Sequence, residues 1–111
     1  DLRMWAVQQA VERGADCILC MDERLAQLSL NVLKQLNLRV PQDISVSGYD
    51  GIALGRYSNP RLTTIRQNSA RLAQRGAEIL LNCIENESGA VHEVVPFELI
   101  EDESVAALPN H

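Results

Sequence analysis

Short apolar runs alternate with longer amphipathic stretches along this chain, and that alternation is the feature that most limits the folds open to it. Strands are expected over 15–21, 44–49, 62–67 and 94–100, and helices over 2–13, 23–36 and 69–85. Strands separated by helices usually pair in parallel, because each helix returns the chain to the same end of the sheet. The expected fold class is therefore α/β, with a parallel sheet flanked by helices.

Composition excludes several classes of partner. Hydrophobic residues make up 46% of the chain and charged residues 23%, as in an ordinary globular domain. Fifteen acidic residues against ten basic ones give a net charge of −5, which opposes nucleic-acid binding by this stretch itself. No apolar run approaches the roughly 18 residues that cross a bilayer, so no membrane partner is expected. The chain begins with Asp1 inside helix-like sequence, and we expect a piece of a longer protein.

Residues that could support catalysis or hold a metal are scarce. Lys34 is the only lysine and lies on the polar face of its expected helix, while His92 and His111 lie in a loop and at the last position. Ser45 and Ser47 lie in a strand, outside any G-x-S-x-G turn. We therefore expect no catalytic residue, no metal and no cofactor.

Three cysteines, an odd number, fit a reducing compartment better than a disulfide framework. Cys17 and Cys20 match C-x-x-C, the spacing of redox and zinc motifs. The run that contains them is expected to be a strand buried on both faces, where residues three apart point to opposite sides. Core packing is the preferred interpretation of both thiols.

Asp50 is the most prominent candidate for ligand contact. It follows the expected strand 44–49 directly, and ligands of open parallel sheets bind beyond the carboxyl ends of the strands. The alternative is that Asp50 and Gly51 simply form a turn.

Asp22 follows the strand before it and also has two interpretations. It either caps the next helix or forms an acid pair with Asp50, and capping is favoured because aspartate is so common at helix N-termini.

The helix expected over 23–36 carries two adjoining apolar stripes, although one sheet needs only one. The first is Leu25, Leu28, Val32 and Leu36, and the second is Ala26, Leu30 and Leu33. The second stripe is covered either by another helix of the same chain or by a partner subunit, and the pattern does not decide between them.

The last expected helix is capped by Asn68 or Ser69 and has one apolar face, which we expect to be buried. That face consists of Ala70, Ala73, Ala77, Leu80, Leu81 and Ile84. The acidic tail from Glu101 to His111 is expected to fray.

Two segments together resemble a known family. Residues 40–50 (VPQDISVSGYD), followed by residues 60–67 (PRLTTIRQ), are similar to the effector-binding region of the lactose-repressor/galactose-repressor (LacI/GalR) family of transcription regulators. The resemblance covers nearly the whole chain but only about the C-terminal third of a regulator. It implies that residues 1–111 are part of an effector-binding and dimerisation domain with a periplasmic-binding-protein-like, three-layer α/β/α fold, incomplete in this chain.

The resemblance also implies partners. Such regulators are cytoplasmic homodimers that bind a small effector, often a sugar, between two lobes. They bind operator DNA through an N-terminal helix-turn-helix, which lies outside this chain.

Particular residues take roles from the same resemblance. Asp50 matches an effector-contacting aspartate, and Met21 and Gln67 fall at two further pocket positions. The dimer interface of the family matches Ala26, Leu30, Leu33, Ile52 and Leu54.

Three positions depart from the family pattern. Met21 replaces a more usual asparagine, Gly51 a frequent second acid, and Asp102 a frequent arginine. A thioether cannot bond a sugar hydroxyl as an amide does, so the class of effector stays open. A periplasmic sugar-binding protein of a transporter is the alternative function, and an enzyme on the same sheet is a more distant one.

Overall fold

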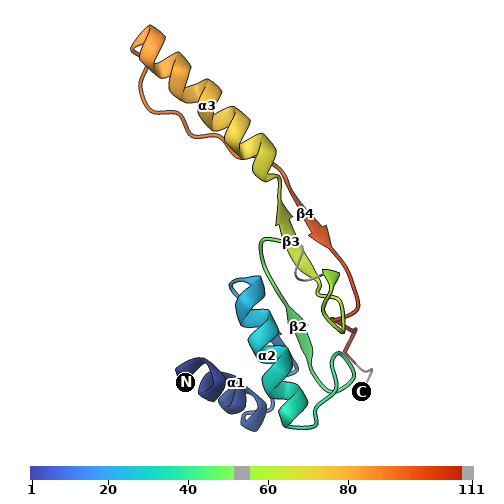
Figure 1. Ribbon diagram of the computed structural model, residues 1–111. Coiled ribbons are helices and arrows are strands. Elements are labelled where there is room, and N and C mark those ends of the chain that lie inside the picture. The colour runs from blue at the N-terminus through green and yellow to red at the C-terminus, as the bar shows by residue number, and fades with distance from the viewer. Residues whose placement is uncertain (52–55, 109–111) are drawn as a thin grey trace. The chain divides into compact units, whose positions relative to one another are not determined.

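The computed structural model describes residues 1–51 and 56–108 and divides into two units. One consists of Asp1–Arg66 with Leu99–His111, and the other is Gln67–Glu98. The elements in chain order are α1 (Leu2–Glu12), β1 (Cys17–Leu19), α2 (Glu23–Gln35), β2 (Ser45–Ser47), β3 (Thr64–Gln67), α3 (Ser69–Asn86) and β4 (Phe97–Ile100) (Figure 1). The order predicted from the sequence is confirmed.

β1 and β2 form a parallel pair, as the alternation of elements predicts. Cys17 is in register with Ser45, and Leu19 with Ser47. A parallel bridge between Ser47 and Thr63 continues the pairing on the other side of β2. β3 and β4 form a second two-stranded pair, and their arrows point in opposite directions in Figure 1. The parallel α/β class is therefore confirmed. The last strand, β4, pairs with β3 and does not pair with β1 or β2.

α2 is the central helix of the first unit. It begins where predicted, because Oδ1 of Asp22 accepts a hydrogen bond of 2.8 Å from the amide of Leu25. α1 packs along it, and β2 packs against it as well (Figure 1). The buried apolar side chains of this core are Val7, Ala26, Leu30, Val32, Leu33, Ile44, Val46 and Leu62.

β1 differs from the expected strand buried on both faces. Ile18 and Cys20 pack against the core, whereas Cys17 is exposed and Leu19 is 81% exposed. Cys17 and Leu19 line a hollow of about 740 Å³ on the other face of the strand. The prediction of core packing was therefore wrong for Cys17, since the helices of this unit cover one side of β1 only.

The tail beyond β4 is held more firmly than the expected fraying implies. Ser104 is fully buried, and its hydroxyl donates to the carbonyl of Val46 and accepts from the amide of Thr63 at 2.9 Å. Its backbone bonds Val46 and Arg61, and the amide of Ala106 donates to Oγ of Ser45 at 3.1 Å. Ser104 is thus the buried centre of a set of hydrogen bonds that ties residues 102–106 to the interior, and tail composition could not predict these contacts.

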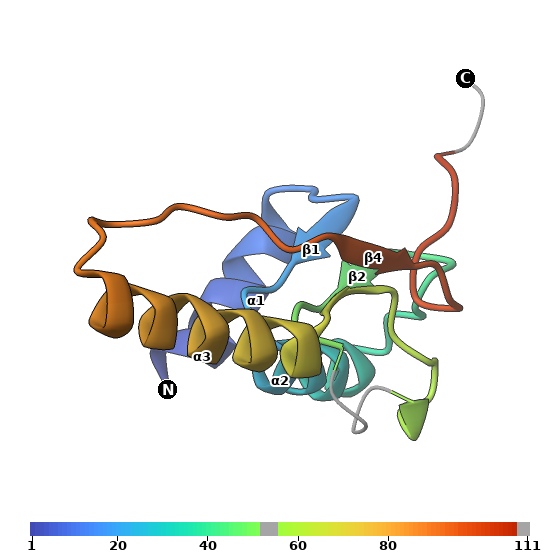
Figure 2. The ribbon, with the colours of Figure 1, turned by 90° about the horizontal axis from the view of Figure 1, so that it is seen from above.

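The second unit consists of α3 and the segment that returns along it (Figure 1 and Figure 2). Oδ1 of Asn68 accepts from the amide of Arg71 at 3.0 Å, which confirms Asn68 as the cap. The guanidinium of Arg75 binds the carboxylate of Glu93 through two hydrogen bonds of 2.7 and 2.9 Å, and these join the returning segment to the helix.

The apolar face predicted for α3 is present but not buried. Leu80, Leu81 and Ile84 are 61%, 58% and 66% exposed, and the helix has no buried residue. The prediction of burial was wrong because periodicity shows that a face is apolar without showing what covers it, and the described residues of this unit supply only the returning segment.

The described helices include none that is both long enough and apolar enough to span a lipid bilayer.

Candidate functional site

Two of the predicted pocket residues follow neighbouring parallel strands. Met21 comes two residues after β1, and Asp50 three residues after β2. Because β1 and β2 are parallel and in register, their carboxyl ends lie at one edge of the sheet. Met21 is 83% exposed and Asp50 is also exposed, so the position that binds ligands in open α/β sheets carries both side chains.

Asp50 and Gly51 form a turn with left-handed backbone. Their φ angles are +83° and +55°, a conformation that glycine, and to a lesser extent asparagine and aspartate, adopt most readily. The amide of Gly51 donates to Oγ1 of Thr64 at 3.2 Å, and a Cβ on Gly51 would lie 2.9 Å from the Cβ of Arg66. The turn is therefore pressed against β3, and this anchoring fixes the backbone that carries the carboxylate of Asp50.

A second carboxylate lies buried beneath the same edge. Glu23, the first residue of α2, is 1% exposed, and neither of its oxygens has a hydrogen-bond partner among the described residues. Gly48 lies against this carboxylate, because a Cβ added to Gly48 would lie 2.9 Å from Oε2 of Glu23. Gly48 therefore lets the chain after β2 pass over a buried acid, and Glu23 was not among the predicted site residues.

Asp22 and Cys20, on either side of Met21, have structural contacts. The carboxylate of Asp22 caps α2, so the favoured interpretation of this acid is confirmed over an acid pair with Asp50. Sγ of Cys20 lies 3.5 Å from Oγ of Ser29. Burial raises the pKa of the Cys20 thiol, which favours the uncharged form of a group packed against the core.

Gln67, the third predicted pocket residue, is the last residue of β3 and the first of the second unit. Its side chain is partly exposed. Its role in a pocket stays a prediction.

The residues matched to a dimer interface divide into two groups. Ala26, Leu30 and Leu33 are 0%, 9% and 0% exposed within the chain itself, in the core beside α1. The apolar stripe that they form is therefore covered within the chain. Of the two alternatives, this agrees with cover by another helix of the same chain rather than by a partner subunit. Ile52 and Leu54 lie outside the described residues, and the dimer interface as a whole stays a prediction.

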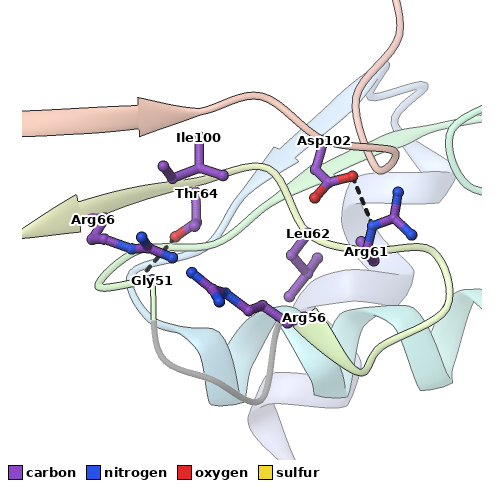
Figure 3. A pocket seen from close by; sticks show the side chains of 8 residues that line it. All are labelled: Gly51, Arg56, Arg61, Leu62, Thr64, Arg66, Ile100 and Asp102. Atoms are coloured by element: carbon purple, nitrogen blue, oxygen red, sulfur yellow. Dashed lines mark hydrogen bonds and ion pairs between the residues drawn. The ribbon is translucent and has the colours of Figure 1, made fainter.

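A cavity of about 330 Å³ lies on the β3 side of the Gly51 turn (Figure 3). Its lining residues are Gly51, Arg56, Arg61, Leu62, Thr64, Arg66, Ile100 and Asp102. Nε of Arg61 donates to Oδ1 of Asp102 at 3.1 Å. Sequence reasoning missed this cavity, because its arginines are scattered at 56, 61 and 66 without a recognisable motif.

Histidine, cysteine, aspartate and glutamate side chains do not converge in threes as a metal site anywhere in the described ranges 1–51 and 56–108.

Comparison with known proteins identifies the class to which this fold and strand-edge site belong. Residues 2–105 match the periplasmic binding protein-like domain family, and the chain belongs to that family. The resemblance to the LacI/GalR regulators is confirmed by the relatives.

The curated relatives are named as repressors. The HTH-type transcriptional repressor PurR of Vibrio campbellii is 39% identical over 90 residues, which are 81% of this chain and 26% of the relative. The chain thus spans about a quarter of the length of such relatives.

Solved structures agree on the fold. The lac repressor dimer bound to operator and the anti-inducer ONPF has a TM-score of 0.85 and 25% identity, over 95% of this chain and 37% of that one. A LacI family regulator from Enterococcus faecalis V583 with bound ribose has a TM-score of 0.87 and 29% identity, over 96% and 40%.

Proposed function

We propose that this chain is the effector-binding part of a LacI/GalR-type transcription regulator, with a sugar as effector. The observation that carries the proposal is the position of Asp50: in a chain of this family, an exposed carboxylate follows β2 on a turn anchored to β3. An ionised carboxylate accepts hydrogen bonds through both oxygens, which suits adjacent hydroxyls of a sugar ring.

The sugar is supported by what the similar structures hold. One of the neighbours above has bound ribose, and another related regulator, CelR, is described as a complex with cellobiose. Met21 supplies an apolar, adaptable surface in place of a polar contact. The effector would therefore place its hydroxyls at Asp50 and an apolar ring face at Met21.

The effector would control DNA binding by shifting the equilibrium between two relative arrangements of the lobes of the regulator. An effector that contacts Asp50 better in one arrangement of the lobes shifts the population toward that arrangement. A homodimer would transmit the difference to DNA-binding parts that these 111 residues do not contain, in line with relatives that are HTH-type repressors. We propose that Gln67–Glu98 belongs to the second lobe, since its apolar helix face needs a covering surface.

The test uses the complete gene product and a panel of sugars that includes ribose, lactose and cellobiose. One sugar should raise the midpoint of thermal unfolding and change operator binding, and Asp50→Asn should abolish both effects. Asparagine keeps the side-chain shape and tolerates the left-handed backbone, so the variant removes mainly the charge. Asp16→Asn is the matched control, because Asp16 is an exposed acid that precedes β1, at the opposite end of this strand from Met21. An unchanged sugar response in Asp50→Asn would refute the assignment.

A periplasmic sugar-binding protein of a transporter is the alternative. It would bind the sugar through the same strand edge but would show no operator binding in the complete gene product. The repressor names of the curated relatives favour the regulator.

A further inference from the structure

We propose that the cavity between the Gly51 turn and β3 is a binding site for a phosphate group, separate from the site at Asp50. The proposal goes beyond the function above, because Asp50 does not line this cavity.

The charges around the cavity are unbalanced. Arg61 is neutralised by Asp102 and lies near Glu103, with Nε 3.7 Å from Oε1. Arg56 and Arg66 have no hydrogen bond or ion pair with a carboxylate in the described residues. Two uncompensated guanidinium groups therefore line one small cavity in a chain whose net charge is −5. An anion placed between the two guanidinium groups would offset their mutual repulsion.

The arrangement suits a small oxyanion. Arg56 and Arg66 come from opposite sides of the cavity, and both side chains extend toward its middle in Figure 3. A planar guanidinium presents paired N–H donors, which match two oxygens of one phosphate. Thr64 lines the same wall. Leu62 and Ile100 supply an apolar lining, which lowers the local dielectric and strengthens each charged hydrogen bond.

The backbone holds one of the two arginines in place. Arg66 lies within β3, and its Cα and Cβ are the atoms that crowd Gly51. The Cα and Cβ atoms of Arg66 are therefore held in position before any ligand binds. Such preorganisation reduces the entropic cost of binding.

The size of the cavity favours a small molecule over a nucleic acid. A volume of about 330 Å³ is at the small end of ligand-sized clefts. Nucleic-acid surfaces carry a basic stripe or patch, whereas this chain is acidic overall. A single phosphate group, free or on a small metabolite, fits both observations.

The experiment titrates the complete gene product with inorganic phosphate by calorimetry, at an ionic strength held constant with chloride. Wild-type protein should bind phosphate, and Arg56→Gln and Arg66→Gln should each weaken binding by about tenfold or more, since each removes a charged hydrogen bond. Glutamine keeps Cβ and Cγ, so the contact of residue 66 with Gly51 survives. Arg13→Gln, an exposed arginine outside the cavity, is the charge-matched control and should bind as wild type does.

Two further variants test the paired donors of Arg66 and the independence of this cavity from the sugar site at Asp50. Arg66→Lys keeps the charge but loses the paired donors and should bind with intermediate affinity. Asp50→Asn should bind phosphate normally even where it abolishes the sugar response. Equal phosphate affinity in wild type, Arg56→Gln and Arg66→Gln would overturn the proposal, as would a phosphate response that chloride reproduces. Arg56 is exposed, so its variant tests the site even if Arg66→Gln folds poorly.

Discussion

A methyl group on Gly51 would lie 2.9 Å from Cβ and 3.1 Å from Cα of Arg66. The φ angle of Gly51 is +55°, in the left-handed region. Steric crowding and backbone conformation thus both favour glycine at this position in this structure. The turn that presents Asp50 therefore depends on the residue after it.

Gly51→Ala should lower the free energy of unfolding by about 2 kcal/mol or more, because backbone strain and the clash add. The measurement is urea unfolding followed by circular dichroism. Gly14→Ala is the control, since Gly14 has φ +77° but nothing within 4 Å of an added Cβ. It should show the conformational cost alone, and equal losses in the two variants would contradict a clash at Arg66.

Ser104→Ala should cost about 1 to 3 kcal/mol of unfolding free energy. The variant leaves the amide of Thr63 and the carbonyl of Val46 without the hydroxyl that bonds both in a fully buried place. Ser88→Ala, at an exposed position, should be neutral within error. Hydrogen exchange at the Thr63 amide should quicken in Ser104→Ala, and unchanged exchange there would contradict the assigned bond.

Leu33→Ala should destabilise the protein by about 2 to 5 kcal/mol, since Leu33 is fully buried in the core. Leu36→Ala lies one turn further along and is 40% exposed, so it should cost clearly less. Because Leu33 is buried within one chain, the loss relative to wild type should not depend on protein concentration. A loss that vanishes as concentration rises would instead place Leu33 at a subunit contact.

Acid should weaken the bond between α3 and its returning segment. Hydrogen bonds from Arg75 lower the pKa of Glu93 below its ordinary value of 4.5. A lowered folded pKa contributes stability above the unfolded value, and this is lost as pH falls through the folded pKa. The carboxyl carbon of Glu93 should titrate by NMR with a midpoint below 4.5, and Arg75→Gln should raise that midpoint. Arg71→Gln should raise it less, because Arg71 acts on Glu93 through charge alone.

Gly76→Ala should stabilise α3 by about 0.5 to 1 kcal/mol, since alanine is the better helix former. Gly76 lies within the helix, and an added Cβ there meets nothing within 4 Å. Slower hydrogen exchange of the helix amides would show the gain. Faster exchange would mean that this face is packed in solution.

Local rules predicted the elements well. Asp22 and Asn68 begin α2 and α3 as their capping chemistry requires, and a strand follows Pro41 as expected, although it ends at Ser47, three residues before Asp50. These features depend on residues a few positions apart, which a sequence shows directly.

Contacts between distant residues were beyond the same rules. The exposed thiol of Cys17 and the open apolar face at Leu80 depend on which surfaces lie against them, and periodicity is silent on that point. Ser104 and Arg66 gave no signal either, because a serine near an acidic tail and an arginine in a strand are ordinary in sequence. Three-dimensional packing alone gives them their roles.

The bonds of Ser104 also bear on how the protein is synthesised. A ribosome delivers Val46 and Thr63 well before Ser104, and all of Gln67–Glu98 emerges in between. The nascent chain must therefore hold an open interior while a whole insertion is translated. The contacts that bury Val46 and Thr63 can therefore be completed only after the second unit has been synthesised.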